Sequence, residues 1–471
     1  MQSDPSGNRV LGLRLVPHAR RASVLHEVHA RPFHALPTPR RLLHFGFVTD
    51  AAQAAADRLS LAAFCTAHGA APPDSGVKHH RAQLGDIALR WEQHSEFTTY
   101  TWELPADAAH PFARPPAAVR ATIAALEQPG PHLVAADLCL LAEADVPDLA
   151  ALPNLAVRSD PGEPGVLAEL PDLATLPDLA ASADLLAMFD PTSLAASLVD
   201  DGAAIVATDF RLTGDGTVRL LVLNRSLTPL RAGALTQRLL EIETYRTLAL
   251  LGLPEAQRLA PEVQRVEAAL ARIAGAMTGS AGLDADHRLL DDLTGLASEL
   301  EAGAVASGVR FGASRAYDEI VQQRLATIRE VAQPGFPTLA AFLARRMAPA
   351  MRTCQMLEAR QADLARKLAR AANLLRTRVD VAIEQQNRDL LRSMNARTRL
   401  QLRLQQTVEG LSIAAISYYV VGLLEHIADG VRAAGYLPVA PVITTAVSVP
   451  IVVVGVALVV RRIRRRHALH D

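Results

Sequence analysis

The chain has 471 residues, and its 48 basic and 49 acidic side chains give a net charge of −1. Such a balance creates no overall field that would attract nucleic acid, so we expect no nucleic-acid partner. Hydrophobic residues make up 50% of the chain but aromatic residues only 4%, which favours helix, and the three widely spaced cysteines indicate neither a disulfide framework nor a zinc site.

Residues 1–252 are predicted to form a mixed α/β domain. Four segments carry a helix or strand pattern: Leu42–Val48, Ala51–His68, Ile87–Glu92 and Phe97–Leu104. The second has helical spacing, the third alternates apolar with polar residues, and the fourth is rich in Thr and aromatic residues. We therefore expect a helix followed by two or three antiparallel strands, with a turn at Gly85 and Asp86.

A low-complexity stretch with frequent prolines follows at about 145–193, and we interpret it as an insertion at the surface of this domain. Ala203–Thr208 and Val218–Leu223 then predict a β-hairpin, because Gly and Asp residues lie between them. The next helix is predicted to begin at Pro229 and to end at Gly252, since proline suits a first helical position and glycine follows helix ends.

Residues 253–409 are predicted to be almost wholly helical. Breaks are expected at three stretches: Gly279–Gly282, Gly308–Gly312 and Pro334–Pro337. The last helix is predicted to begin near Pro349, and about sixty residues of it would extend roughly 90 Å. Such a stalk helix cannot bury its apolar stripe alone, so it needs the preceding helices or copies of itself. We expect a homo-oligomer formed through this stalk, in the manner of a coiled coil.

Residues 410–460 are predicted to form a two-helix transmembrane hairpin. Val442–Val460 is apolar, has no charge and is followed by an arginine cluster in the tail 461–471, a pattern typical of a membrane span. Gly410–Leu424 is short for a span, so a re-entrant or interfacial segment is the alternative. Arginines flank the hairpin on the side away from its loop, so both termini and most of the mass are expected in the cytoplasm.

The densest cluster of histidines and carboxylates is His26, Glu27 and His29. Imidazole and carboxylate groups suit divalent transition metals, so these three residues are candidate metal ligands. They do not form the HExxH motif of zinc proteases, because the second histidine comes two residues after the glutamate. The alternative is a polar segment whose side chains form hydrogen bonds with the body of the domain.

Acidic residues also lie at the predicted outer end of the first span. Glu425 and Asp429 are four residues apart, hence on one helical face, and Ser412 lies within the span. In a ring of subunits these residues would form the mouth of a cation pore. In a simple anchor they are interfacial polar residues at the end of a helix.

On the predicted β-hairpin, Asp209 and Arg211 either bind an anion or metal, or form a pair that holds the sheet.

Three motifs resemble those of a bacterial family known as domain of unknown function 3422: His26-Glu-Val-His-Ala-Arg-Pro32, Thr208-Asp-Phe-Arg211 and Glu241-Ile-Glu-Thr-Tyr-Arg246. The resemblance covers essentially the whole chain and implies a bacterial, membrane-associated protein, with no activity that can be transferred to a residue. The layout also resembles CorA-type magnesium channels. Their Gly-Met-Asn motif is absent, and Glu425-His-Ile-Ala-Asp429 stands in its place.

The sequence supports three functional hypotheses and names no cofactor, although a divalent cation fits two of them. The preferred hypothesis is a membrane-anchored, non-enzymatic sensor or scaffold whose ligand is unknown. The second is a CorA-like oligomeric transporter of divalent cations. The third is a metal-dependent enzyme that uses the histidine cluster at His26 and His29. In each case the lipid bilayer is an expected partner.

Overall fold

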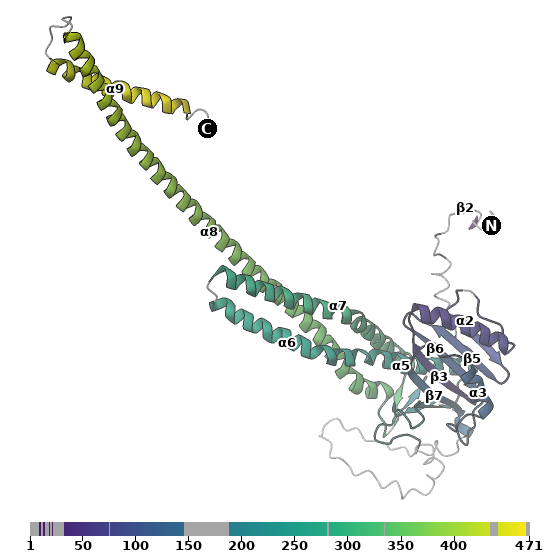
Figure 1. Cartoon of the computed structure of the whole chain (residues 1–471). Coiled ribbons are helices and arrows are strands. Elements are labelled where there is room, and N and C mark those ends of the chain that lie inside the picture. Colours follow the sequence, from purple (N-terminus) through teal and green to yellow (C-terminus); the bar gives the residue numbers. More distant parts are fainter. Residues whose placement is uncertain are drawn as a thin grey trace, which may run out of the picture. The chain divides into compact units, whose positions relative to one another are not determined.

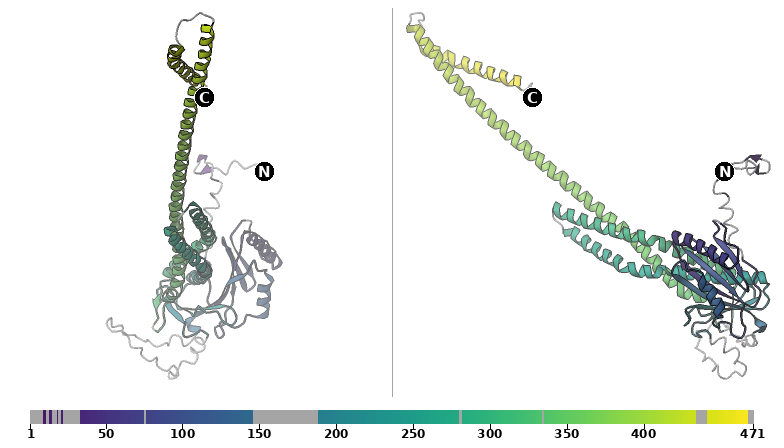
Figure 2. Two further views of the ribbon diagram at one scale, coloured as in Figure 1. Left: turned by 60° about the vertical axis from the view of Figure 1, so that its left-hand side comes forward. Right: turned by 45° about the vertical axis from the view of Figure 1, so that its right-hand side comes forward.

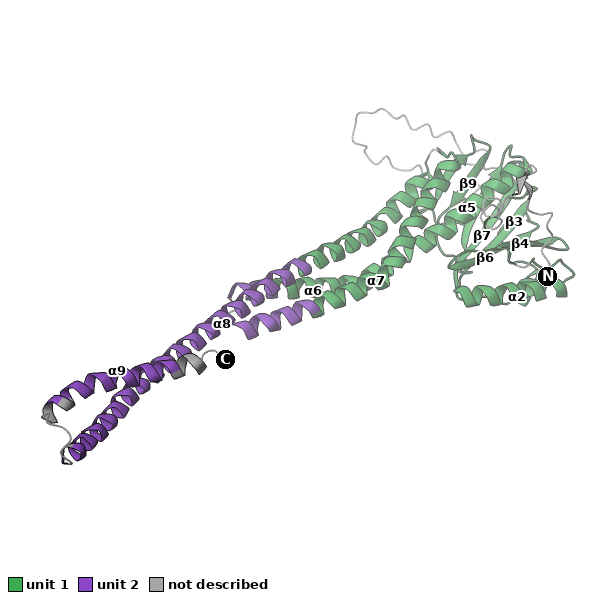
Figure 3. Cartoon of the chain, turned by 90° about the horizontal axis from the view of Figure 1, so that it is seen from above, with its two compact units in different colours: residues 1–271, 295–368 green, residues 272–294, 369–471 purple. Residues whose placement is uncertain are grey.

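The computed structural model describes residues 33–74, 76–145, 188–279, 282–333, 335–433 and 441–467, together with the short pieces 9–10, 13–14, 18 and 21. Two compact units divide the chain (Figure 3). The first comprises residues 1–271 and 295–368, and the second comprises residues 272–294 and 369–471. The boundaries expected at 252, 409 and 460 divide the chain differently and stay predictions. Most of the low-complexity stretch at 145–193 lies outside the described residues.

The first unit contains a nine-stranded mixed sheet, so the α+β class expected from the sequence is confirmed (Figure 1). Its strands in spatial order are β11 (Val331–Ala332), β8 (Ala195–Val199), β9 (Ala204–Thr208), β10 (Val218–Asn224), β7 (His132–Ala142), β3 (Arg40–Val48), β6 (Phe97–Leu104), β5 (Ile87–Gln93) and β4 (His79–Leu84). Only the β10–β7 pair is parallel among these neighbours. A separate two-stranded pairing joins β1 (Arg9–Val10) to β2 (Leu13–Arg14).

One face of the sheet packs against α2 (Ala51–Ala67), with the shorter α3 (Ala117–Ala125) beside it. Alternate residues of β5 and β6, among them Trp91 and Trp102, are fully buried against Leu61 and Phe64 of α2. The alternation read from the sequence is therefore that of two paired strands, and Gly85 supplies the positive φ of 65° needed by the turn that joins β4 to β5. The expected helix begins with a capping box between Asp50 and Gln53.

The other face packs against α5 (Pro229–Leu250) and helices that follow it. Leu138 and Leu220 of the sheet join Leu235 and Leu239 of α5 in the largest buried cluster. Thr228 caps α5 by accepting a hydrogen bond from the backbone N–H of Arg231, as its sequence position suggests. The predicted hairpin is also confirmed, because β9 pairs with β10 in antiparallel register.

The remaining helices are α6 (Gly252–Gly279), α7 (Leu283–Thr327), α8 (Leu339–Ala433) and α9 (Pro441–His467). Breaks occur near Gly279–Gly282 and Pro334–Pro337 as predicted. The break expected at Gly308–Gly312 is wrong, since α7 runs through it (Figure 2). A glycine costs a helix only about 1 kcal/mol, which the packing of a long helix overrides. The last helix also begins earlier than expected, with Pro349 inside it.

The second unit contains the C-terminal part of α6, the first turns of α7, α8 from Ala369 onward, and α9. Arg378 of α8 joins the other two helices, because its guanidinium donates to the carbonyl of Met277 at 2.8 Å and lies 3.8 Å from Asp286. By length and composition, one described helix, Leu339–Val431, is apolar enough to cross a membrane, with 6% of its most apolar window buried. Helix α9 forms where the second span was expected, but this criterion does not select it among the described residues, so the predicted hairpin is not supported.

Candidate functional site

A polar half-face of the sheet lies beneath α5, at the end of the sheet formed by β3, β6, β5 and β4. The strand register places its side chains in two rows: Arg81, Arg90, Thr101 and His44 in the first, and His79, Glu92, Thr99 and Gly46 in the second. These residues alternate along each strand with the apolar residues that face α2. The polar side of the alternating strands is therefore covered by a helix rather than exposed.

Helix α5 presents a polar face of its own to these rows. Gln237, Glu241 and Thr244 follow one another at helical spacing, and Gln237 and Thr244 are buried. Between the helix and the sheet lies a pocket of about 190 Å³. Its lining residues are His44, Arg90, Glu92, His94, Phe97, Thr99, Gln237, Leu240, Glu241, Thr244, Tyr245 and Arg324. A water molecule needs only about 10–15 Å³ of such space, so the pocket has room for a small molecule.

His44 forms the inner wall of this α5 pocket and is held as a neutral imidazole. Its Nδ1 and Nε2 atoms each lie 2.8 Å from a threonine hydroxyl, of Thr101 and Thr244 respectively. The Thr244 hydroxyl donates to the carbonyl of Leu240, so it accepts from Nε2–H, and Nδ1 accepts from Thr101. Burial, with a contribution from the positive charge of Arg90, lowers the pKa of His44 to about 3.

Arg90 and Glu92 place two opposite charges in the pocket with little solvent contact, since they are 9% and 7% exposed. Arg90 donates from Nη1 to Gln237 at 3.2 Å, whereas its Nε has no hydrogen-bond partner among the described residues. The hydroxyl of Thr99 is also buried without a partner there. By contrast, the guanidinium of Arg324 is paired with the carboxylate of Glu241. Burying a charged or polar group without its full set of partners costs free energy, so the Arg90 guanidinium and the Thr99 hydroxyl favour a bound partner.

A second pocket of about 440 Å³ shares His94, Phe97 and Tyr245 with the α5 pocket. Basic side chains, those of Arg58 and Lys78, line its other side. The two pockets therefore lie next to each other, separated by these three shared side chains.

Two of the three motifs quoted above lie at or near the α5 pocket. In the segment that ends at Arg246, Glu241 and Tyr245 line the pocket, while Glu243 accepts two hydrogen bonds of 2.6 Å from Arg246. The guanidinium of Arg246 also lies 5.0 Å from the ring centre of Phe210, which belongs to the Thr208–Arg211 motif. These motif residues therefore hold the helix that roofs the pocket against the sheet.

The chain also crosses α5 at the edge of this site. A Cβ atom on Gly233 would lie 1.7 Å from the carbonyl oxygen of His34, so only glycine allows this crossing. Leu36 fixes it by donating from its backbone to Pro229 at 2.8 Å. Burial and the charge of Arg81 lower the pKa of His34.

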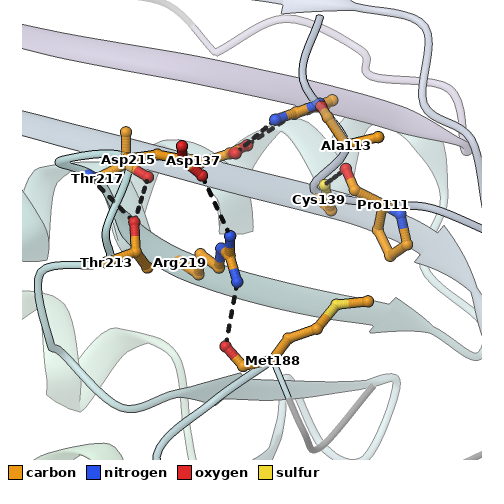
Figure 4. A network of polar contacts seen from close by, with 10 residues as sticks. Pro111, Ala113, Asp137, Cys139, Met188, Thr213, Asp215, Thr217 and Arg219 are labelled. Atoms are coloured by element: carbon orange, nitrogen blue, oxygen red, sulfur yellow. Dashed lines mark hydrogen bonds and ion pairs between the residues drawn. The ribbon is translucent and has the colours of Figure 1, made fainter. Parts of the chain in front are cut away.

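On the α2 face lies a larger cleft of about 870 Å³, with Phe45, Phe47 and Trp102 in its floor. An ion pair ends the cleft, because the Arg41 guanidinium donates to both carboxylate oxygens of Asp137, at 2.8 and 2.6 Å. Asp215 and Arg219 lie beside Asp137 (Figure 4). Burial raises the pKa of Asp137 although Arg41 opposes the shift. The charges of Arg41 and Asp137 compensate each other, so this ion pair holds β3 to β7, although Nε of the neighbouring Arg219 is buried without a hydrogen-bond partner among the described residues.

The candidate metal ligands His26, Glu27 and His29 lie outside the described residues and stay predictions. Within the part of the chain that is described, no group of three or more His, Cys, Asp or Glu side chains is arranged to hold a metal ion. Asp209 and Arg211 do not bind each other through their side chains: Arg211 pairs with Asp190, and Asp209 accepts the backbone N–H of Arg211 at 3.0 Å.

The candidate pore residues Glu425, Asp429 and Ser412 all lie on α8 and are exposed. The hydroxyl of Ser412 donates to the carbonyl of Val408 at 2.9 Å, within its own helix. Their assignment to a pore is untested by this arrangement and stays a prediction.

The residues of the α5 pocket escaped prediction. Arg90 and Glu92 were seen only as the polar half of an alternating strand, a pattern that is usually solvent-exposed. The sequence did contain a signal for this site. Gln237, Glu241 and Thr244 recur at helical spacing in a helix that is otherwise buried, and such a polar helix face can pack against the polar face of a sheet in the same domain.

No curated protein matches this chain, and no solved structure does. One family model matches residues 16–467, nearly the whole length, and its description is "Protein of unknown function". The chain therefore belongs to the family DUF3422.

Proposed function

We propose that this protein is a membrane-anchored, non-enzymatic sensor or scaffold whose α/β unit binds a small polar ligand in the α5 pocket. The observation that carries the proposal is that Arg90 Nε and the Thr99 hydroxyl are buried without a hydrogen-bond partner among the described residues, beside the mostly buried side chain of Glu92. Polar groups buried without partners destabilise a folded protein, and they are retained where a ligand completes them.

Membrane attachment is supported by the C-terminal part of α8. Its apolar side chains are exposed over more than five turns, for example at Leu411, Ile416, Leu423 and Ile427. Such a surface is costly in water and is suited to lipid. We propose that α8 and α9 form the two spans of a hairpin in the bacterial inner membrane, with both termini in the cytoplasm, because arginines end the apolar part of α9 from Arg461 onward.

Self-association is supported by the middle of α8. Apolar side chains remain exposed there without covering groups in the described chain: Leu374, Val381, Leu390, Leu391, Met394, Leu400 and Leu404. A second copy of the helix would bury them, so we propose a homo-oligomer formed through this stalk as a coiled coil.

The proposed ligand site is tested by replacing Thr99 with valine in the full-length protein in detergent. Because Thr99→Val removes an unpaired buried hydroxyl, the empty protein should become more stable by about 1 kcal/mol. The matched control is Thr98→Val, which removes a hydroxyl that lies 3.3 Å from Thr49 and should destabilise. Thermal melts would be recorded with and without a small-molecule extract of the expression host.

We expect the extract to raise the melting temperature of the wild type and of Thr98→Val, but to have a weaker effect on Thr99→Val. If Thr99→Val destabilises as much as Thr98→Val and the extract moves none of the three, the pocket is not a ligand site.

A second candidate function is a CorA-like oligomeric transporter of divalent cations. It is favoured by Glu425 and Asp429, two exposed carboxylates one turn apart on α8, because acidic residues concentrate cations at a pore mouth. Ser412 lies on the same helix, nearer its N-terminus. Its test is uptake of Mg²⁺ into proteoliposomes that contain the full chain. Uptake should fall in the double variant Glu425→Ala/Asp429→Ala and persist in Asp389→Ala, which removes a carboxylate from the stalk. Absence of uptake of any divalent cation would remove this candidate.

A metal-dependent enzyme that uses His26, Glu27 and His29 is the third hypothesis. It is tested by metal analysis of the purified full chain, where a bound divalent metal that is lost in His26→Ala/His29→Ala would support it.

A further inference from the structure

The two buried charges of the α5 pocket are held at a defined separation. Arg90 and Glu92 are two residues apart on β5, so both side chains leave the same face of the strand, with Cα atoms roughly 6–7 Å apart. They do not form an ion pair with each other, nor with another described residue. A cationic and an anionic group therefore face one small space side by side.

Each charge has a neutral neighbour that can take part in binding. Gln237 accepts from Arg90 Nη1, and Arg90 Nε is buried without a hydrogen-bond partner among the described residues. Thr99 lies directly across from Glu92 in the register of β5 and β6, and its hydroxyl has no partner among the described residues. A ligand donor placed at Glu92 is thus also within the neighbourhood of the Thr99 hydroxyl.

The charge balance of the pocket selects the kind of ligand. Glu241 and Arg324 neutralise each other, and His44 is neutral because burial lowers its pKa to about 3. What remains is one positive and one negative group. A simple anion would compensate Arg90 and leave Glu92 without an ionic partner among the described residues, and a simple cation would do the reverse. A ligand that carries both charges compensates both.

We propose that the α5 pocket binds a zwitterion of the α-amino-acid class, with its carboxylate on Arg90 and its ammonium group on Glu92. The inference rests on the proposed function, since it names the ligand class of the same site. The volume of about 190 Å³ is sufficient for a small amino acid such as alanine. Guanidinium groups suit carboxylates because their parallel N–H donors match the two oxygens.

The test is calorimetric titration of the full-length protein in detergent at pH 7 with three probes of similar size: L-alanine, propionate and ethylamine. Losing one charged hydrogen bond weakens binding by roughly tenfold or more, so alanine should bind at least tenfold more tightly than either half-molecule. In Glu92→Gln this advantage over propionate should vanish, and in Arg90→Gln the advantage over ethylamine should vanish. Asp86→Asn, in the exposed turn of the same hairpin, should bind like the wild type.

Other outcomes overturn the inference in distinguishable ways. If propionate binds as tightly as alanine, or if Glu92→Gln keeps the alanine preference, the zwitterion is wrong while the pocket remains a ligand site. If no probe binds the folded wild type, the amino-acid class is wrong, and the extract experiment with Thr99→Val decides separately whether the pocket binds anything. If a single variant fails to fold, the three-probe comparison on the wild type and on Arg90→Gln/Glu92→Gln still decides, because the double variant removes both charges together.

Discussion

Buried polar side chains of the first unit fall into two kinds. Some are fully satisfied: the carboxylate of Asp57 accepts hydrogen bonds from Trp91 at 2.7 Å and from the Tyr100 hydroxyl, although burial still raises its pKa. Others, such as Thr99 Oγ1 and Arg90 Nε, are left open, and both line the α5 pocket. The first kind specifies packing, whereas the second destabilises the folded protein. Atoms of the second kind also occur away from the pocket, at Arg219 and Ser314, so the proposed binding site rests on their proximity to Glu92 and to a cavity.

His44 predicts a pH dependence of stability. Its folded-state pKa of about 3 lies below the ordinary 6.5, so between these values the unfolded chain binds more protons than the folded one. The free energy of unfolding must therefore fall as the pH drops below 6.5, by about 1.4 kcal/mol at pH 5.5. In His44→Gln, which keeps a donor toward Thr244, this share of the pH dependence should disappear.

The measurement is the difference between melting temperatures at pH 7.5 and pH 5.5. It should be smaller in His44→Gln than in the wild type, even if the variant melts lower at both. The exposed His132 supplies the control, since His132→Gln should retain the wild-type difference. An unchanged difference in His44→Gln would mean that the imidazole is not held neutral.

At the scale of elements, period-two patterning located strands β5 and β6, because one face of each is strongly apolar, and Gly85 and Asp86 located the turn that precedes β5. It could not say what covers the other face. The covering helix α5 lies about 150 residues further along the chain from Arg90, and the contact between Arg90 and Gln237 depends on how the whole sheet is assembled. Strand β8 was also not predicted, because its sequence of Ala, Ser, Leu and Val residues is short and weakly patterned.

Glycines in the long helices show how far local propensity can mislead. Gly308 suggested a break, yet it lies inside α7, and a Cβ atom added there meets nothing within 4 Å. Gly308→Ala should therefore stabilise the protein by up to about 1 kcal/mol, through helix propensity and a less flexible unfolded chain. Gly252→Ala is the contrasting variant, because its Cβ would lie 2.6 Å from the Ser314 hydroxyl oxygen and 3.1 Å from the Cys354 sulfur.

Thermal melts of Gly308→Ala and Gly252→Ala measure these two opposite changes in stability. The melting temperature should rise in Gly308→Ala and fall in Gly252→Ala. A fall in both would show that α7 needs a flexible residue near its middle, as the sequence alone had suggested.

At the scale of the whole molecule, α8 belongs to both compact units, with residues 339–368 in the first and 369–433 in the second. The α5 pocket lies entirely in the first unit, and the exposed apolar surface of α8 in the second. The proposed ligand site and the proposed membrane-attachment surface therefore lie in separate units, which share the continuous helix α8. If the proposed hairpin is correct, it places both ends of the chain on the cytoplasmic side of the membrane.

That topology predicts the labelling pattern of single cysteines. The native Cys65, Cys139 and Cys354 are 0%, 0% and 3% exposed, and burial raises the pKa of each thiol, so they should react little with a maleimide. Gly430→Cys, near the end of α8, should react with a membrane-impermeant maleimide in intact spheroplasts of a bacterial host. Ser393→Cys, exposed on the stalk, should react only after lysis, because the proposed hairpin keeps the stalk in the cytoplasm. Labelling of Gly430→Cys only after lysis would contradict two spans and favour the re-entrant or interfacial alternative for the end of α8.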